Sequence, residues 1–116
     1  MAMIRMQPKR MLWLGDSLEA VKDSSAEARR EAGHQLSRVQ TGEEPTDWKP
    51  METVGAGVRE IRVRVEKAYR VVYVAKFAEA IYVLHAFEKK TQRTSKSDLD
   101  LSSGRYRRLI NERTKK

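Results

Sequence analysis

Basic side chains recur at three places in the second half of the sequence, and their spacing predicts a surface that binds phosphate groups. Arg62 and Arg64 stand two residues apart in a segment of alternating apolar and charged residues, so both side chains point to one face of a strand. Arg70 interrupts an otherwise apolar segment, where an unpaired guanidinium group is costly to bury, and it therefore needs an acidic partner, a ligand or water. Lys89 and Lys90 follow a third apolar segment. If the segments are neighbouring strands, these cations line one concave patch that suits phosphate oxygens.

Each of these cations also has a purely structural interpretation. Arg62 and Arg64 alternate with acidic residues, a pattern typical of a solvent-exposed strand face with ion pairs between strands. Arg70 has Glu60 and Glu88 as candidate partners for a structural ion pair. A pair of adjacent lysines is also common on ordinary exposed surfaces. The residues alone leave the structural and the phosphate-binding interpretations open.

The other residues that could bind a metal or act in catalysis indicate neither a metal-dependent enzyme nor a hydrolase with a catalytic triad. The sequence has no cysteine and two histidines, so we predict neither a metal site nor a cofactor. His85 lies in an apolar segment, which is typical of a buried histidine whose hydrogen bonds are made within the core. The order of serines, histidines and acidic residues along the chain does not indicate a hydrolase triad. Tyr106 stands among arginines, where an exposed ring can stack on a nucleic-acid base or pack on a partner protein.

The overall charge favours a polyanionic partner. The 116 residues include 24 Lys and Arg against 16 Asp and Glu, which gives a net charge of +8. Nucleic acid is the first candidate, ahead of an acidic protein or an anionic membrane surface. Residues 16–57 carry a net −4, whereas residues 58–103 carry +4 and residues 104–116 carry +5. No run approaches the ~18 apolar residues that span a bilayer, so we expect a soluble, cytoplasmic protein without a membrane partner.

The spacing of apolar residues predicts one α+β domain over residues 11–110, with flexible basic ends at 1–10 and 111–116. Apolar residues recur at helical spacing in the first half and alternate with charged ones over residues 58–65, whereas residues 69–75 and 80–87 are apolar on both faces apart from Arg70. We predict, in order, a short strand at 11–14, helices at 16–22 and 24–41, a loop at 43–51, strands at 58–65, 69–75 and 80–87, and a weak final helix that begins at 95–98. Two N-terminal helices then pack on a small antiparallel sheet, made of the short first strand and a three-strand meander.

Three blocks of sequence carry a resemblance to a known family. They read GVREIRV at residues 57–63, YRVVY at 69–73 and VLHAFEKKTQ at 83–92. In this order and spacing they resemble the phage-derived, HigB-like branch of the RelE/ParE toxin superfamily, and the resemblance extends from about Met11 to Leu109. It implies a RelE/ParE-like fold and the toxin of a type II toxin–antitoxin pair. It further implies cleavage of mRNA on the ribosome and neutralisation by a helix-turn-helix antitoxin.

The resemblance also implies roles for individual residues. Arg70 is similar to the strand arginine that binds the scissile phosphate in the RNA-cleaving members, and Lys90 to their basic residue after the last strand. Arg62 and Arg64 are similar to cations on the preceding strand. Those members often end with a catalytic tyrosine or histidine, for which Tyr106 is the C-terminal candidate in this chain.

The chemistry of RNA cleavage explains why cations are central to such a site. When a ribose 2′-hydroxyl attacks, the phosphorane carries two negative charges, which preorganised Arg or Lys groups stabilise more than they stabilise the ground state. A lysine crowded by arginines has a lowered pKa and can act as base or acid, and a carboxylate is the alternative base. The predicted catalytic residues are Glu60, Arg70, Lys89 and Lys90, and the predicted substrate-binding residues are Arg62, Arg64, Arg93 and Tyr106.

Three other classes of function remain open at this point. One is a purely structural phage protein, which needs no concave cationic face. A ParE-like inhibitor of DNA gyrase keeps the fold and lacks the RNA-cleaving cations. A non-catalytic RNA- or ribosome-binding phage-derived protein keeps the positive charge without a working acid and base. Retention of Arg70 and Lys90 argues against the gyrase inhibitor.

Overall fold

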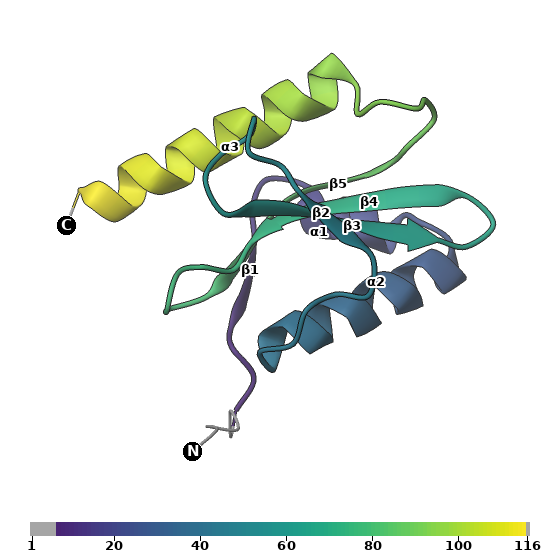
Figure 1. Ribbon diagram of the computed structural model, residues 1–116, viewed down its shortest axis with the longest axis horizontal. Helices are drawn as coiled ribbons and strands as arrows, with labels where there is room; N and C mark the ends of the chain where they lie inside the picture. The colour runs from purple at the N-terminus through teal and green to yellow at the C-terminus, as the bar shows by residue number, and fades with distance from the viewer. Residues whose placement is uncertain (1–6, 116) are drawn as a thin grey trace.

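A five-stranded sheet with helices on both faces makes up the described part of the chain, residues 7–115 of a computed structural model (Figure 1). The strand order is β1-β5-β4-β3-β2; β1 pairs with β5 in parallel and all other neighbours are antiparallel. The elements are β1 Met11–Trp13, α1 Ser17–Lys22, α2 Ala26–Gln40, β2 Trp48–Pro50, β3 Val58–Arg64, β4 Ala68–Val74, β5 Ile81–Glu88 and α3 Lys96–Thr114. The predicted α+β class and the β3–β4–β5 meander are confirmed.

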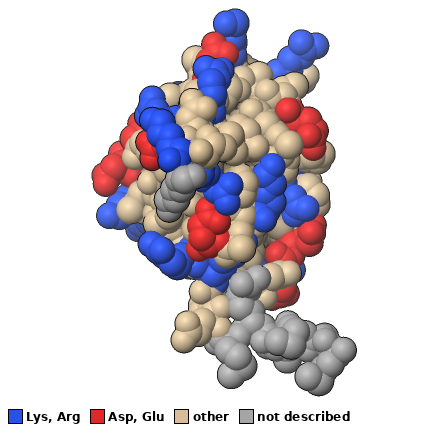
Figure 2. Space-filling model, turned by 90° about the vertical axis from the view of Figure 1, so that its left-hand side faces the viewer, with Lys and Arg blue, Asp and Glu red and all other residues tan. Residues whose placement is uncertain are grey.

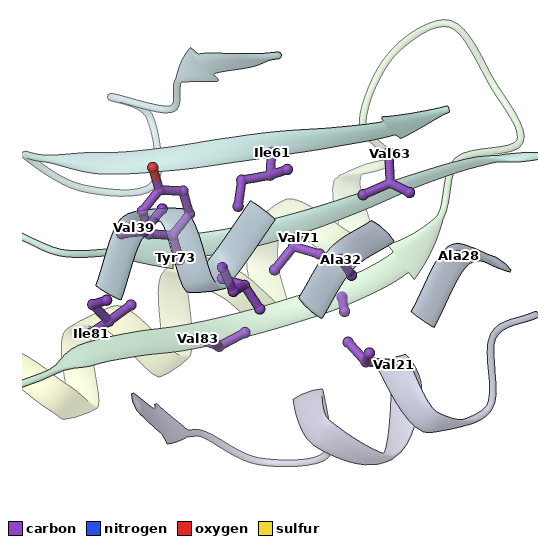
Figure 3. Packing of buried hydrophobic residues seen from close by; sticks show 12 residues of the cluster. Val21, Ala28, Ala32, Val39, Ile61, Val63, Val71, Tyr73, Ile81 and Val83 are labelled. Carbon is purple, nitrogen blue, oxygen red and sulfur yellow. The ribbon is translucent and has the colours of Figure 1, made fainter. Parts of the chain in front are cut away.

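Helix α2 covers one face of the sheet with a stripe of small and aliphatic residues. It begins at Ala26 rather than at the predicted residue 24, because Ser25 is its cap: the Ser25 hydroxyl accepts a hydrogen bond from the backbone N–H of Ala28. Gly42 follows its end in a left-handed conformation, as predicted. Figure 3 shows Ala32 and Val39 of this helix facing Tyr73 and its neighbours on the strands. These residues enclose the larger part of the apolar core.

Helix α3 begins where the sequence predicts a final helix, runs to Thr114, and covers the opposite face of the sheet. Ser95 caps it by accepting a hydrogen bond from the N–H of Asp98. Leu109 is buried in a second core cluster with strand residues, and Arg105 donates a hydrogen bond of 2.8 Å to the carbonyl of Leu84. A glycine, three serines and two aspartates weaken its helical propensity, so packing on the sheet stabilises this helix. Residues 111–114, which we expect to belong to a flexible end, form the last part of this helix, and residue 116 lies outside the described residues.

Two predictions about the sheet are wrong. The predicted loop at 43–51 contains β2, which ends in Pro50, and a proline is tolerated there because an edge strand leaves some N–H groups without a ladder partner. The sheet is not wholly antiparallel, because β1 runs parallel to β5. A strand that joins the sheet far along the chain from its neighbour has no tight turn to set its direction.

The N-terminal lead-in that we expect to be flexible is only partly described. Residues 1–6 of that segment lie outside the described residues. From residue 7 the chain approaches the end of α2, where the backbone N–H of Lys9 donates to the carbonyl of Gln40. Within residues 7–115 no helix combines the length and the apolar character needed to cross a bilayer.

Leu36 provides a test of the packing between α2 and the sheet. Its side chain is 2% exposed, so Leu36→Ala removes buried methyl groups and leaves a cavity, and we expect the free energy of unfolding to fall by about 2 to 5 kcal/mol in urea denaturation. His34→Ala on the exposed side of the same helix is the control, and it should change the free energy of unfolding by less than about 0.5 kcal/mol. Equal losses in both variants contradict the assigned orientation of α2.

Candidate functional site

Three arginines lie on the face of the sheet that is turned away from α1 and α2. Along β3, Ile61 and Val63 pack into the core beneath α2, so strand alternation directs Arg62 and Arg64 to the opposite face. Arg62 is directly opposite Arg70 in the β3–β4 register, which places both side chains on that same face. The structure thus brings together the three arginines that the sequence singles out.

A carboxylate with no exposed surface lies among these arginines. Glu60 is fully buried, and its Oε1 lies 3.4 Å from Nε of Arg70 and 3.8 Å from Nζ of Lys49. Its Oε2 accepts a hydrogen bond of 3.1 Å from the hydroxyl of Thr94, in the loop before α3. An isolated carboxylate is too costly to bury, so these partners are what keep Glu60 in this position.

Arg70 is both a structural partner and an incompletely satisfied group. It is 6% exposed, and its Nη1 donates a hydrogen bond of 3.1 Å to the carbonyl of Tyr69. The predicted pairing with Glu60 is confirmed, yet Nε of Arg70 and Oε1 of Glu60 have no hydrogen-bond partner among the described residues. Burial lowers the pKa of the Arg70 guanidinium, Glu60 opposes that shift and Arg62 adds to it. The group stays charged at neutral pH, because an arginine starts from a very high pKa.

Asp47 faces the two arginines of β3. Its carboxylate oxygens lie 3.7 Å from Nη1 of Arg62 and 3.5 Å from Nε of Arg64, and its carbonyl accepts a hydrogen bond from the N–H of Arg62. The side chain of Arg64 is 67% exposed, whereas that of Arg62 is 29% exposed. These are loose ion pairs in contact with water, so an anion such as a phosphate can compete with Asp47 for both guanidinium groups.

Lys89 brings a further cation to the same face, just after the end of β5. Its backbone N–H donates to the carbonyl of Ala68, which extends the β4–β5 pairing by one residue. Burial lowers the pKa of Lys89, and the charge of Arg70 adds to this shift, as expected for a lysine crowded by arginines. Lys90 and Arg93 are exposed in the loop that follows, so they border this face without entering its buried part.

We call these residues the cationic cluster: Lys49, Arg62, Arg64, Arg70 and Lys89 around the buried Glu60. The loop between β5 and α3 lies at the same end of the molecule as the β3–β4 turn (Figure 1). The polar neighbours that hold this cluster are not predicted from the sequence. Asp47 and Lys49 lie in the stretch predicted as loop, and Thr94 precedes a helix predicted to be weak. Their contacts are made between residues far apart in the chain, for which local patterns carry no signal.

Tyr106 does not join the cationic cluster. Its hydroxyl donates a hydrogen bond of 3.1 Å to the carbonyl of Ala56, before the start of β3, whereas Arg62 and Arg64 lie at the end of that strand. Its ring packs against the second core cluster and directly against Gly55, where even a Cβ atom would collide with it. The expectation of an exposed ring is therefore wrong, because Tyr106 anchors α3 to the turn before β3.

Basic side chains are not confined to the cationic cluster. Figure 2 shows the end of the molecule at which the chain terminates, where Lys and Arg side chains are numerous and mixed with Asp and Glu. At this end Arg113 of α3 forms an ion pair of 2.8 Å with Glu79, and a hydrogen bond from Arg113 lowers the pKa of the Glu79 carboxyl to about 2. Mutual neutralisation of this kind distinguishes this end from the cationic cluster, where the cations outnumber the acids.

Among residues 7–115, no group of three or more His, Cys, Asp or Glu side chains is arranged to hold a metal ion. The residues of the cationic cluster are donors of hydrogen bonds with one buried acceptor, a set that suits phosphate oxygens. The arrangement can therefore bind a polyanion and stabilise negative charge that develops on it.

Comparison with known families adds a finding that is independent of this geometry. The family model described as phage-derived protein Gp49-like (DUF891) matches residues 19–107. The matched range contains every residue of the cationic cluster, as well as α2, the strands β2 to β5 and the first part of α3. No curated protein matches the chain.

Proposed function

The chain belongs to the phage-derived Gp49-like family, a family of the RelE/ParE toxin type, and from this membership we propose that it is the toxin of a type II toxin–antitoxin pair. Within that class we propose a RelE/ParE-like arrangement of the HigB-like branch and an activity as a ribosome-dependent mRNA endoribonuclease. The observation that carries the proposal is the cationic cluster, in which five basic side chains lie on one face of the sheet and two of them, Arg70 and Lys49, pair with a buried carboxylate.

In the proposed reaction, RNA supplies its own nucleophile. The ribose 2′-oxygen forms a bond to phosphorus while the bond from phosphorus to the 5′-oxygen breaks, which leaves a cyclic phosphate and a free 5′-hydroxyl. Arg70 is placed to stabilise the doubly charged phosphorane. Lys89 takes the proton of the 2′-hydroxyl, since its lowered pKa increases the fraction of neutral amine at neutral pH. Lys90 returns a proton to the 5′-oxygen.

The remaining residues of the cluster have supporting roles in this proposal. Arg62 and Arg64 hold the phosphates that flank the scissile bond, and Arg93 extends the contact along the exposed loop. Glu60 is the alternative base. Its present partners, Arg70, Lys49 and Thr94, fix its position.

A non-catalytic RNA- or ribosome-binding protein is the second candidate. The observation that favours it is the ion pair between Arg70 and Glu60, because a guanidinium held by a carboxylate can serve structure alone. Addition of the purified protein to a translating bacterial extract separates the candidates. Cleaved mRNA supports the toxin proposed above, and arrested translation with intact mRNA supports the binder. Inhibition of gyrase supercoiling with translation unaffected indicates the ParE-like alternative.

Substitution of Arg70 tests its proposed role at the phosphorane. We expect Arg70→Lys to lower the cleavage rate by about 100- to 1,000-fold, because a planar pair of donors to the transition state is lost. The lysine keeps a positive charge beside Glu60, so the melting temperature of the variant should be close to that of the parent protein. Arg70→Ala is less informative, since removing one partner of a buried ion pair costs about 3 to 5 kcal/mol of stability.

Arg64→Lys is the matched control for Arg70, because it makes the same change at an exposed arginine on the same face. We expect it to lose less than about tenfold in cleavage rate. An Arg70→Lys variant that cleaves within threefold of the parent refutes the catalytic assignment and leaves Arg70 as the partner of Glu60.

The salt dependence of RNA affinity tests the phosphate contacts of β3. For a single strand, the logarithm of the affinity should fall with the logarithm of the salt concentration at a slope of about −0.7 per phosphate contact. Arg62→Ala with Arg64→Ala should therefore make the slope shallower. Asp47→Asn should act in the opposite direction and raise the affinity, because it releases both guanidinium groups from a competing anion.

The control for these slopes is Arg29→Ala with Arg30→Ala, which removes the same charge from exposed positions of α2, on the other face of the sheet. This pair should leave the slope at the parental value. If Arg62→Ala with Arg64→Ala also leaves the slope unchanged, Arg62 and Arg64 belong to an ordinary solvated strand face.

We further propose that the partner is a helix-turn-helix antitoxin that approaches the basic surface of α3 through an acidic segment. Arg107 and Arg108 are exposed on that helix, so reversing both to glutamate should slow association in stopped-flow measurements, most strongly at low salt. The same reversal at Arg29 and Arg30 is the control. If the Arg107 and Arg108 variant associates at the parental rate, the antitoxin binds another surface, which we expect to be α1 and α2.

A further inference from the structure

Buried polar atoms that lack a hydrogen-bond partner gather on the face of the sheet that bears the cationic cluster. Among the described residues there are five such side-chain atoms, and four of them belong to this face: Oε1 of Glu60, Nε of Arg62, Nε of Arg70 and Nδ1 of His85. Unsatisfied buried groups lower stability, and in native proteins they call for an explanation. Three of the four belong to the cluster described above, and the fourth identifies His85 as a residue that the proposed function has not used.

His85 lies beside the cluster without belonging to it. It is buried on β5 opposite Val72, and its ring stacks on Phe87 with 5.0 Å between the ring centres. Phe87 in turn is opposite Arg70 in the β4–β5 register. His85 and Arg70 are therefore diagonal neighbours on one face of adjacent strands, a relation that spans about 7 to 8 Å.

The other ring nitrogen of His85 ties the sheet to the beginning of α3. Nε2 lies 2.7 Å from Oδ1 of Asp98, in the first turn of the helix. The second carboxylate oxygen of Asp98 accepts a hydrogen bond of 2.7 Å from the hydroxyl of Ser95, and that hydroxyl caps the helix by accepting from the Asp98 N–H. A single aspartate thus joins the strand histidine to the helix cap.

The residue before the cap reaches the centre of the cationic cluster. Thr94 donates its hydroxyl hydrogen bond to Oε2 of Glu60, while the far end of α3 is held separately, by Leu109 in the core and by Arg113 on Glu79. The contact between His85 and Asp98 therefore positions the segment that carries Thr94, at the end of the helix where the cluster lies.

We propose that His85 is a positioning residue for RNA cleavage: through Asp98 it fixes the start of α3, so that Thr94 holds Glu60 in the orientation that Arg70 and the proposed chemistry require. This inference rests on the proposed function and adds a residue to it. His85 does not touch RNA in this scheme. A displacement of reacting groups by about 1 Å can lower a rate by about a hundredfold, so a remote contact of this kind has a measurable effect on catalysis.

Four variants separate this positioning role from a general effect on folding. His85→Leu removes the donor to Asp98, and Asp98→Ala removes the acceptor from the other side. His85→Gln keeps an N–H donor near the place of Nε2. Thr94→Val removes the hydrogen bond to Glu60 and leaves the pair of His85 and Asp98 intact. The measurements are the single-turnover cleavage rate of mRNA on saturating programmed ribosomes, the RNA affinity, and amide hydrogen exchange along α3.

For His85→Leu and Asp98→Ala we expect cleavage to fall by about tenfold to a hundredfold, with RNA affinity within twofold of the parent. Amides of residues 94–99 should exchange faster, while the amide of Leu109 keeps its parental rate. His85→Gln should restore both cleavage and protection. Thr94→Val should lower the cleavage rate to the same extent. The amides of residues 94–99 should exchange at the parental rate in this variant, because the helix cap is unchanged.

Two results overturn the inference even when the variants fold. One is parental exchange at residues 94–99 in both His85→Leu and Asp98→Ala, which shows that the pair does not fix the helix start. The other is parental cleavage in these variants despite faster exchange. A parent protein that cleaves no mRNA on the ribosome refutes the proposed function instead, and hydrogen exchange then decides alone whether His85 positions the start of α3.

Discussion

The buried carboxylate of Glu60 is the constraint on which the charged face of the sheet depends. A carboxylate without exposed surface is tolerated inside a protein only if cations and hydrogen-bond donors replace the water that it has lost. Arg70, Lys49 and Thr94 supply those groups from a neighbouring strand, an edge strand and a loop. Their convergence on one anion explains why residues from three distant parts of the chain lie together, and why additional cations beside them remain incompletely neutralised.

The layers of the fold follow from the need to bury both faces of the central strands. β4 and β5 carry apolar residues on both sides, so a single layer of helices on one face would leave half of these residues in water. α1 and α2 cover one face, and α3 covers part of the other. The part that α3 does not cover is where the strands become basic, and the loop before α3 borders it.

How much of this architecture the sequence predicts depends on the range of the interactions concerned. The strict alternation around Ile61 and Val63 predicts β3 and the orientation of Arg62 and Arg64, because burial on one face repeats every two residues. β2 escapes prediction, since three residues ending in proline have no periodicity. α3 is underestimated because only two of its residues, Ser102 and Leu109, are buried, and the anchoring of Arg105 and Tyr106 depends on partners elsewhere in the chain.

The parallel pairing of β1 with β5 has a consequence for how the chain reaches its structure. Met11 is aligned with Ile81, so a short N-terminal strand can be placed only after some 70 later residues exist and have been ordered. Closing so long a loop carries an entropic cost that local helices such as α2 do not bear, and contacts of this separation slow folding. During synthesis, the first described strand therefore emerges early, stays unpaired while the helices form, and waits for the last strand before the edge of the sheet is complete.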